Sequence, residues 1–167
     1  MGKGIYEYTE ISDLKDMITK SAKKFGDEPA FRFKTDTPGE FRETTYKEFY
    51  DEINALGTAL IDLGLKNKRI AVISENRYDW GVAYLAVVAG TGLVVPLDKS
   101  LPENELRSLI ERSEADAIIY SQKYDDIMKK VKEDDFSNLK YYISMDLEKE
   151  ENKILYQKEL IKKGKNY

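Results

Sequence analysis

Four short runs of apolar residues, separated by segments with helical spacing, constrain the fold of this chain more than any other feature. The runs lie at residues 69–74, 93–97, 117–120 and 141–144. A continuous apolar run is typical of a strand that is covered on both faces. Strands that alternate with helices need right-handed crossovers and therefore align in parallel. We expect an α/β fold, with a doubly wound, mostly parallel sheet flanked by helices over residues 69–144.

The segments outside this unit predict a helix and a short β-hairpin over 12–44, a second helix over 45–64, and a charged C-terminal helix over 154–163. Apolar side chains from Leu14 to Phe25 recur at helical spacing, and Pro38-Gly39 lies in a loop between two short apolar segments. Thr45 and Glu48 have the spacing of a capping box.

Composition excludes several classes of function. The chain has no histidine and no cysteine, which rules out Ser-His-Asp triads, cysteine nucleophiles, thiolate metal sites and disulfides. Its formal net charge of −4 argues against a nucleic-acid-binding protein. The uncharged stretch at 81–97 is shorter than the roughly 20 residues that a transmembrane helix needs. We therefore expect a cytoplasmic protein without a transmembrane segment.

The loop after the first apolar run is the best candidate for a ligand site, because parallel sheets bind ligands at the carboxyl ends of their strands. Asn76, Tyr78 and Trp80 form the predicted rim of a substrate pocket, with Arg77 as a further donor. An alternative is structural: Asn76 caps the next helix and Trp80 packs against the sheet. Lys99, at the next strand end, could meet an anion or remain solvated.

No phosphate-binding loop is present. The sequence contains neither G-x-x-x-x-G-K-[ST] nor G-x-G-x-x-G. Gly90-Thr91-Gly92 follows a helix and enters a strand, which is the wrong polarity for a helix N-terminus that holds an anion. Mixed charges in the last forty residues fit solvated helix faces. We assign no catalytic, cofactor-binding or metal-ligating residue to this chain.

Several stretches in a fixed order resemble the N-terminal portion of AMP-forming acyl-CoA synthetases, in the adenylate-forming superfamily. They are residues 27–31 (DEPAF), 45–49 (TYKEF), 59–64 (ALIDLG), 69–72 (RIAV), 75–80 (ENRYDW), 86–90 (AVVAG), 95–98 (VPLD) and 117–120 (AIIY). The ENRYDW stretch is more similar to the long-chain members. The family's phosphate loop, its adenine and magnesium motif, its ribose-binding aspartate and its C-terminal lysine are all missing.

The resemblance implies that residues 1–167 are the N-terminal segment of the large domain of an ATP-dependent fatty acid–CoA ligase. The fold of this segment would be incomplete, and the segment would be inactive alone. ATP, Mg²⁺ and coenzyme A would be cofactors of the full-length enzyme. The main partner would be the remainder of the polypeptide, and an exposed sheet edge would allow self-association. The alternative is a self-standing, flavodoxin-like module that binds a small molecule or a partner.

Overall fold

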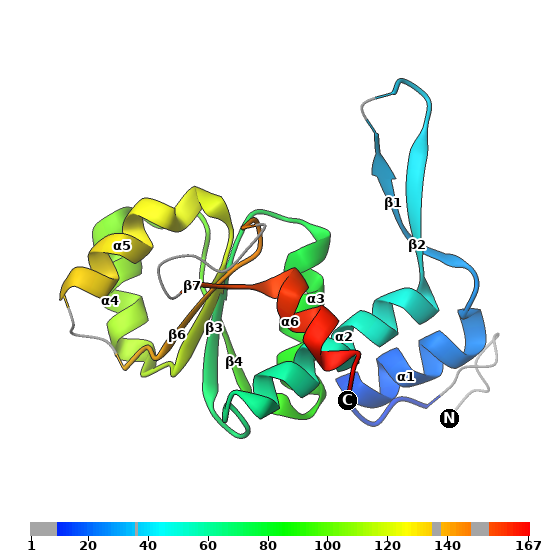
Figure 1. Ribbon diagram of the computed structural model, residues 1–167, viewed down its shortest axis with the longest axis horizontal. Coiled ribbons are helices and arrows are strands. Elements are labelled where there is room, and N and C mark those ends of the chain that lie inside the picture. Colours follow the sequence, from blue (N-terminus) through cyan, green and yellow to red (C-terminus); the bar gives the residue numbers. More distant parts are fainter. Residues whose placement is uncertain (1–9, 36, 135–137, 148–153) are drawn as a thin grey trace, which may run out of the picture.

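A five-stranded parallel sheet forms the centre of the molecule (Figure 1). The computed structural model describes residues 10–35, 37–134, 138–147 and 154–167. The strand order is β4-β3-β5-β6-β7, and every neighbouring pair is parallel. The strands are β3 (Arg69–Ile73), β4 (Leu93–Pro96), β5 (Ala117–Tyr120), β6 (Tyr141–Ser144) and β7 (Ile154–Tyr156). The predicted α/β class and parallel sheet are confirmed.

Helices cover both faces of the sheet (Figure 1). In chain order they are α1 (Leu14–Phe25), α2 (Tyr46–Asp62), α3 (Tyr78–Ala86), the π-helical turn η1 (Val87–Thr91), α4 (Glu103–Ser113), the 3₁₀ turn η2 (Gln122–Tyr124), α5 (Asp125–Asp134) and α6 (Gln157–Gly164). None of the helices in the described part of the chain is long and apolar enough to cross a membrane.

Alternate residues of the strands enter two separate cores, as the two-residue repeat of a strand requires. Ile70 and Val72 pack with α1, α2, α3 and α6, whereas Ala71 and Ile73 pack with α4 and α5. All four side chains are fully buried. A strand buried on both faces has to be apolar at every position, which is why these runs stand out in the sequence.

The N-terminal hairpin stands apart from this sheet and projects from the body (Figure 1). It consists of β1 (Pro29–Lys34) and β2 (Phe41–Thr45), which pair in antiparallel orientation. The capping box joins the hairpin to α2: the Glu48 amide donates to Thr45 Oγ1 over 3.1 Å, and the Thr45 amide donates to Glu48 Oε2 over 2.8 Å. The hairpin and the start of α2 therefore follow from local sequence signals.

The C-terminal segment differs from the prediction of one helix over 154–163. Residues 154–156 are strand β7, which pairs with β6, and α6 begins at Gln157. Ile154, Leu155 and Tyr156 are apolar or aromatic, so the same residues satisfy a helical repeat or a short strand. Pairing with β6 decides between them, and it extends the sheet to a fifth strand.

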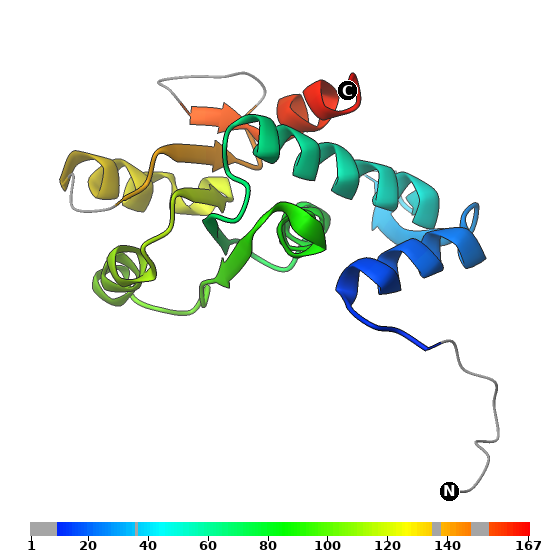
Figure 2. The ribbon, with the colours of Figure 1, turned by 90° about the horizontal axis from the view of Figure 1, so that it is seen from below.

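Helix α6 lies beside α2 (Figure 2), at a very short distance from it. A Cβ atom built on Gly164 would lie 1.9 Å from the backbone oxygen of Ala55. Only glycine allows two helix backbones to approach this closely. The contact fixes the position of α6 relative to α2 and to the hairpin.

Candidate functional site

The chain changes direction across the sheet at β3, which lies between β4 and β5. From β3 the chain passes first to β4 and then crosses to β5 on the other side. Open α/β sheets bind ligands at such a switch point, outside the carboxyl ends of the strands. The relevant loops are 74–77 after β3 and 121–124 after β5.

At the switch point, side chains of the two loops bind each other. The Ser121 hydroxyl, buried at the end of β5, donates a hydrogen bond to Glu75 Oε2. This hydrogen bond from Ser121 lowers the pKa of Glu75, because it stabilises the ionised carboxylate. The carboxylate at the switch point therefore stays negative and does not favour a phosphate there.

Arg77 ties three strand ends together. Its Nε donates to Asp79 Oδ2 over 2.9 Å, and one terminal nitrogen donates to Asp146 Oδ1 over 2.7 Å. The other oxygen of Asp146 accepts from the Gln122 amide over 2.7 Å. Burial lowers the pKa of Arg77, but the bonds to Asp146 and Asp79 outweigh burial and raise it overall. Arg77 therefore links the loop after β3 to the loop after β6, and Asp146 extends this link to the loop after β5.

The structure separates the three predicted rim residues. Asn76 is exposed, and its side-chain oxygen accepts from Lys99 Nζ over 2.9 Å. Trp80 stacks on Tyr84 with 5.1 Å between ring centroids and packs against the larger core. Arg77, and not Asn76, occupies the N-cap position of α3, without a side-chain cap bond. The structural alternative is therefore wrong for Asn76 as a cap, while Trp80 packs as that alternative expected.

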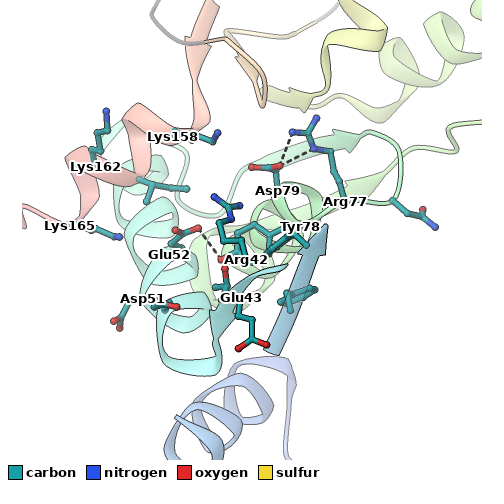
Figure 3. A pocket seen from close by; sticks show the side chains of 16 residues that line it. Arg42, Glu43, Asp51, Glu52, Arg77, Tyr78, Asp79, Lys158, Lys162 and Lys165 are labelled. Carbon is teal, nitrogen blue, oxygen red and sulfur yellow. Dashed lines mark hydrogen bonds and ion pairs between the residues drawn. The ribbon is translucent and has the colours of Figure 1, made fainter. Parts of the chain in front are cut away.

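Tyr78 lies in a large groove, to which Asn76 also contributes. The groove has a volume of about 1220 Å³ and runs between the hairpin, α2, the start of α3 and α6 (Figure 3). Trp80 does not line it. The lining residues are Phe31, Phe33, Arg42, Glu43, Thr44, Glu48, Asp51, Glu52, Asn76, Arg77, Tyr78, Asp79, Lys158, Ile161, Lys162 and Lys165.

Aromatic rings form one side of the groove. The ring of Tyr78 lies 5.1 Å from that of Phe31 and 5.4 Å from that of Phe33, and both contacts are edge-to-face. The Tyr78 hydroxyl donates to Glu52 Oε2 over 3.1 Å. Burial, followed by the charge of Glu52, raises the pKa of Tyr78 far above its ordinary value, so this hydroxyl stays protonated.

Charged side chains of opposite sign line the groove from two adjacent helices, α2 and α6 (Figure 3). Helix α6 contributes Lys158 and Lys162, the C-cap of α6 contributes Lys165, and α2 contributes acidic residues that include Asp51 and Glu52. The lysines recur at intervals of four and three residues, which places them on one side of α6. These lysines are exposed, as the prediction of solvated helix faces requires, but that prediction did not include the groove. The lysine spacing was the available signal.

The groove offers charged, polar and aromatic side chains that can bind a ligand. Over the described ranges there is no cluster of three or more histidine, cysteine, aspartate or glutamate side chains that could hold a metal ion. The groove contains hydrogen-bond donors, cations and aromatic rings, whereas the switch point is occupied by Glu75 and Ser121.

Comparison with known proteins identifies the family. The family model described as AMP-binding enzyme matches residues 18–165. Long chain acyl-CoA synthetase 1 of Arabidopsis thaliana is 30% identical over 114 residues, which are 66% of this chain and 17% of that protein. Fatty acyl-CoA synthetase B of Dictyostelium discoideum is 30% identical over 135 residues, 75% of this chain and 20% of that protein.

Solved structures share the fold. Coronafacic acid ligase from Pectobacterium brasiliense superposes with a TM-score of 0.78 at 23% identity, covering 93% of this chain and 30% of that one. An anthranilate CoA ligase in complex with anthranoyl-AMP gives 0.76 at 18% identity, over 91% of this chain and 28% of that one. The chain spans about a fifth of the length of the two curated relatives. It belongs to the AMP-binding enzyme family and corresponds to an N-terminal part of its members.

Proposed function

We propose that this chain is the N-terminal segment of an ATP-dependent, AMP-forming fatty acid–CoA ligase. The observation that carries the proposal is the family match over 18–165, together with relatives named as long-chain and fatty acyl-CoA synthetases. In the proposed reaction, a fatty acid carboxylate attacks the α-phosphate of ATP, and pyrophosphate leaves. The thiol of coenzyme A then displaces AMP from the acyl-adenylate. ATP, Mg²⁺ and coenzyme A serve the whole enzyme.

The contribution of this segment is the scaffold, and the isolated chain is inactive in this proposal. Two observations support inactivity. The sequence has no glycine-rich phosphate loop, and the switch point of the sheet holds the Glu75 carboxylate bound to Ser121. Triphosphate binding requires backbone amides, cations or Mg²⁺ close to the phosphates. The groups that would supply them lie in other parts of the proposed enzyme.

An ATP–pyrophosphate exchange assay tests both parts of this proposal. The isolated chain, incubated with ATP, Mg²⁺ and palmitate, should give no exchange above the rate without protein. The product of the complete open reading frame should exchange faster with palmitate than with acetate or benzoate. Exchange by the isolated chain would refute its inactivity. A full-length protein that prefers acetate or benzoate would refute the fatty-acid assignment.

The remainder of the polypeptide is the main proposed partner, and the isolated chain should also self-associate. Strand β4 is an edge of the sheet, and its Leu93 side chain is 58% exposed. An apolar edge strand is a template for pairing with another chain. Light scattering of the isolated chain should therefore show a dimer or a larger species. A monomer that persists at high concentration contradicts this part of the proposal.

A further inference from the structure

We propose that the remainder of the full-length polypeptide packs on the apolar side of the molecule that α3, η1 and β4 form. We call this side the α3–β4 surface; its residues are Trp80, Tyr84 and Val88 on the helical part and Leu93 and Pro96 on the edge strand. The groove described above includes none of these five residues in its lining. The proposal rests on the proposed function, because it takes this chain as one segment of a longer enzyme.

The sequence has no charged residue from Trp80 to Leu97, and the structure places this stretch at one edge of the sheet. It contains most of α3, all of η1 and the edge strand β4. Strand β4 lies away from α6, which follows the strand at the opposite edge (Figure 2). A continuous apolar surface on a soluble protein marks a site of contact with another part or another molecule.

Helix α3 lacks the charged outer side that a helix on a protein surface normally has. Val82 and Ala86 are buried in the larger core. Tyr84 and Val88 each follow one of them by two positions, which places them on the opposite side of the helix, and both are only half-buried. The ring of Tyr84 stacks on that of Trp80, with 5.1 Å between centroids. The outer side of α3 is therefore aromatic and aliphatic.

Helices α4 and α5, which cover the other face of the same sheet, have the charged outer side that α3 lacks. Glu103 of α4 pairs with Lys130 of α5, with 2.7 Å between Oε1 and Nζ. Glu111 of α4 and Lys129 of α5 are exposed. Two helices of this sheet are thus suited to contact with water, whereas the sequence of α3 is suited to burial on all sides.

Strand β4 continues the apolar surface around the edge of the sheet. Val94 packs with the larger core, on the α3 side, and Val95 packs with the smaller core on the other side. Leu93 shares the face of Val95, because side chains alternate along a strand. Its side chain is 58% exposed, and Pro96 is also exposed. The apolar surface therefore extends from α3 across the edge to the opposite face.

The backbone of β4 offers few hydrogen bonds to an incoming strand. The amides of Leu93 and Leu97 donate to backbone oxygens on the β3 side, over 2.9 and 3.0 Å. Alternation then directs the backbone of Val94 and Pro96 outward, and proline has no N–H group. Within Leu93–Pro96, which the structure describes in full, only Val94 presents an N–H outward. Apolar side chains must therefore supply most of the contact.

The length of the relatives points to the occupant of this surface. The two synthetases compared above are matched over only 17% and 20% of their length, so most of the proposed enzyme lies outside this chain. Permanent interfaces are more apolar than transient ones and resemble the core of a domain. A segment of the same polypeptide is never released, which suits a surface without charge.

Hydroxyl-radical footprinting with mass spectrometry tests the proposal. The isolated chain and the product of the complete open reading frame are oxidised in dilute solution. Tyr84 and Leu93 should react several-fold more slowly in the full-length protein, while Leu109 on α4 should react equally in both. Equal rates for Tyr84 and Leu93 would overturn the proposal. Protection that appears only when the full-length protein is concentrated would also overturn it, because a second copy would then be the cover.

A matched pair of variants tests the same surface through stability. Leu93→Lys should lower the urea unfolding midpoint of the full-length protein much more than that of the isolated chain, because only the cover takes the new charge out of water. Leu109→Lys makes the same substitution on α4 and should lower the midpoint equally in both proteins. A Leu93→Lys variant with equal effects in the two proteins contradicts the proposal.

Neither readout depends on turnover, so this inference and the proposed function can fail separately. A full-length protein that catalyses ATP–pyrophosphate exchange while Leu93 stays accessible refutes the α3–β4 contact and leaves the ligase assignment intact. A full-length protein that protects Tyr84 and Leu93 but gives no exchange supports the contact and refutes the ligase assignment.

Discussion

The switch point of the sheet and the groove beside the hairpin differ in how their charged groups are used. At the switch point, Glu75 binds Ser121, and Arg77 binds both Asp79 and Asp146. In the groove, Lys158 and Lys165 are exposed, and the positive charge of Lys165 helps to lower the pKa of Glu48 on α2, after the larger effect of the hydrogen bonds from Thr45. At the switch point, polar side chains bind one another and hold the strand ends together. In the groove, exposed lysines and aromatic rings line the same surface.

This difference shows that position in the fold is a weaker guide to a ligand site than the hydrogen bonds and ion pairs that the polar side chains already form within the protein. The carboxyl ends of parallel strands are where ligands usually bind, yet hydrogen bonds within the protein close that region here. The groove begins at the same loop, through Asn76 and Arg77, and extends to the hairpin, α2 and α6. A polar group that already has a buried or half-buried partner loses that bond when a ligand displaces it.

The largest effect is expected from Gly164→Val, which would break the groove while leaving the switch point intact. The new side chain would collide with the backbone oxygen of Ala55, so α6 would have to move away from α2. Overpacking of this kind typically costs about 1–3 kcal/mol of unfolding free energy. Urea denaturation measures this cost.

The control for that prediction is Lys163→Val, at an exposed position next to Gly164. It introduces the same side chain into the same helix, without the collision. Its unfolding free energy should stay close to that of the parent. If both variants lose the same amount of stability, helix propensity and not the close approach of α2 and α6 explains the loss.

A moderate effect is expected from Arg77→Ala, which opens the network at the strand ends. The Arg77 and Asp146 side chains are 30% and 25% exposed, so their ion pair is partly shielded from water. We expect a loss of about 1 kcal/mol in unfolding free energy. A double-mutant cycle with Asp146→Ala measures the coupling, and simple additivity of the two losses would show that the tie is not stabilising.

The smallest effect is expected from Glu75→Gln, and it should depend on pH. The Ser121 hydrogen bond lowers the pKa of Glu75 below its ordinary value of 4.5 in the folded protein. Its contribution to stability is therefore fully present above the unfolded-state pKa and is lost as pH falls through the folded-state value. The stability difference between parent and variant should shrink between neutral and acidic pH. A difference that grows on acidification contradicts this assignment.

Much of the fold could be predicted because its signals are local. The apolar runs that form β3 to β6 and the capping box of Thr45 and Glu48 each lie within a few residues. Strand β7 was missed because three apolar residues fit a helical repeat as well as a strand. The site was harder to predict: Tyr78 lies in the groove and Trp80 in the core, although both follow the same strand.

By itself, the sequence determined the alternation of strands and helices, the caps, and the absence of histidine, cysteine and a phosphate loop. These properties depend on residue type and on spacing along the chain. The tertiary structure alone decided that Arg77 pairs with Asp146 and that the Tyr78 hydroxyl donates to Glu52. Such pairings join residues far apart in the chain, and only packing of the helices and the hairpin brings their side chains within reach of one another.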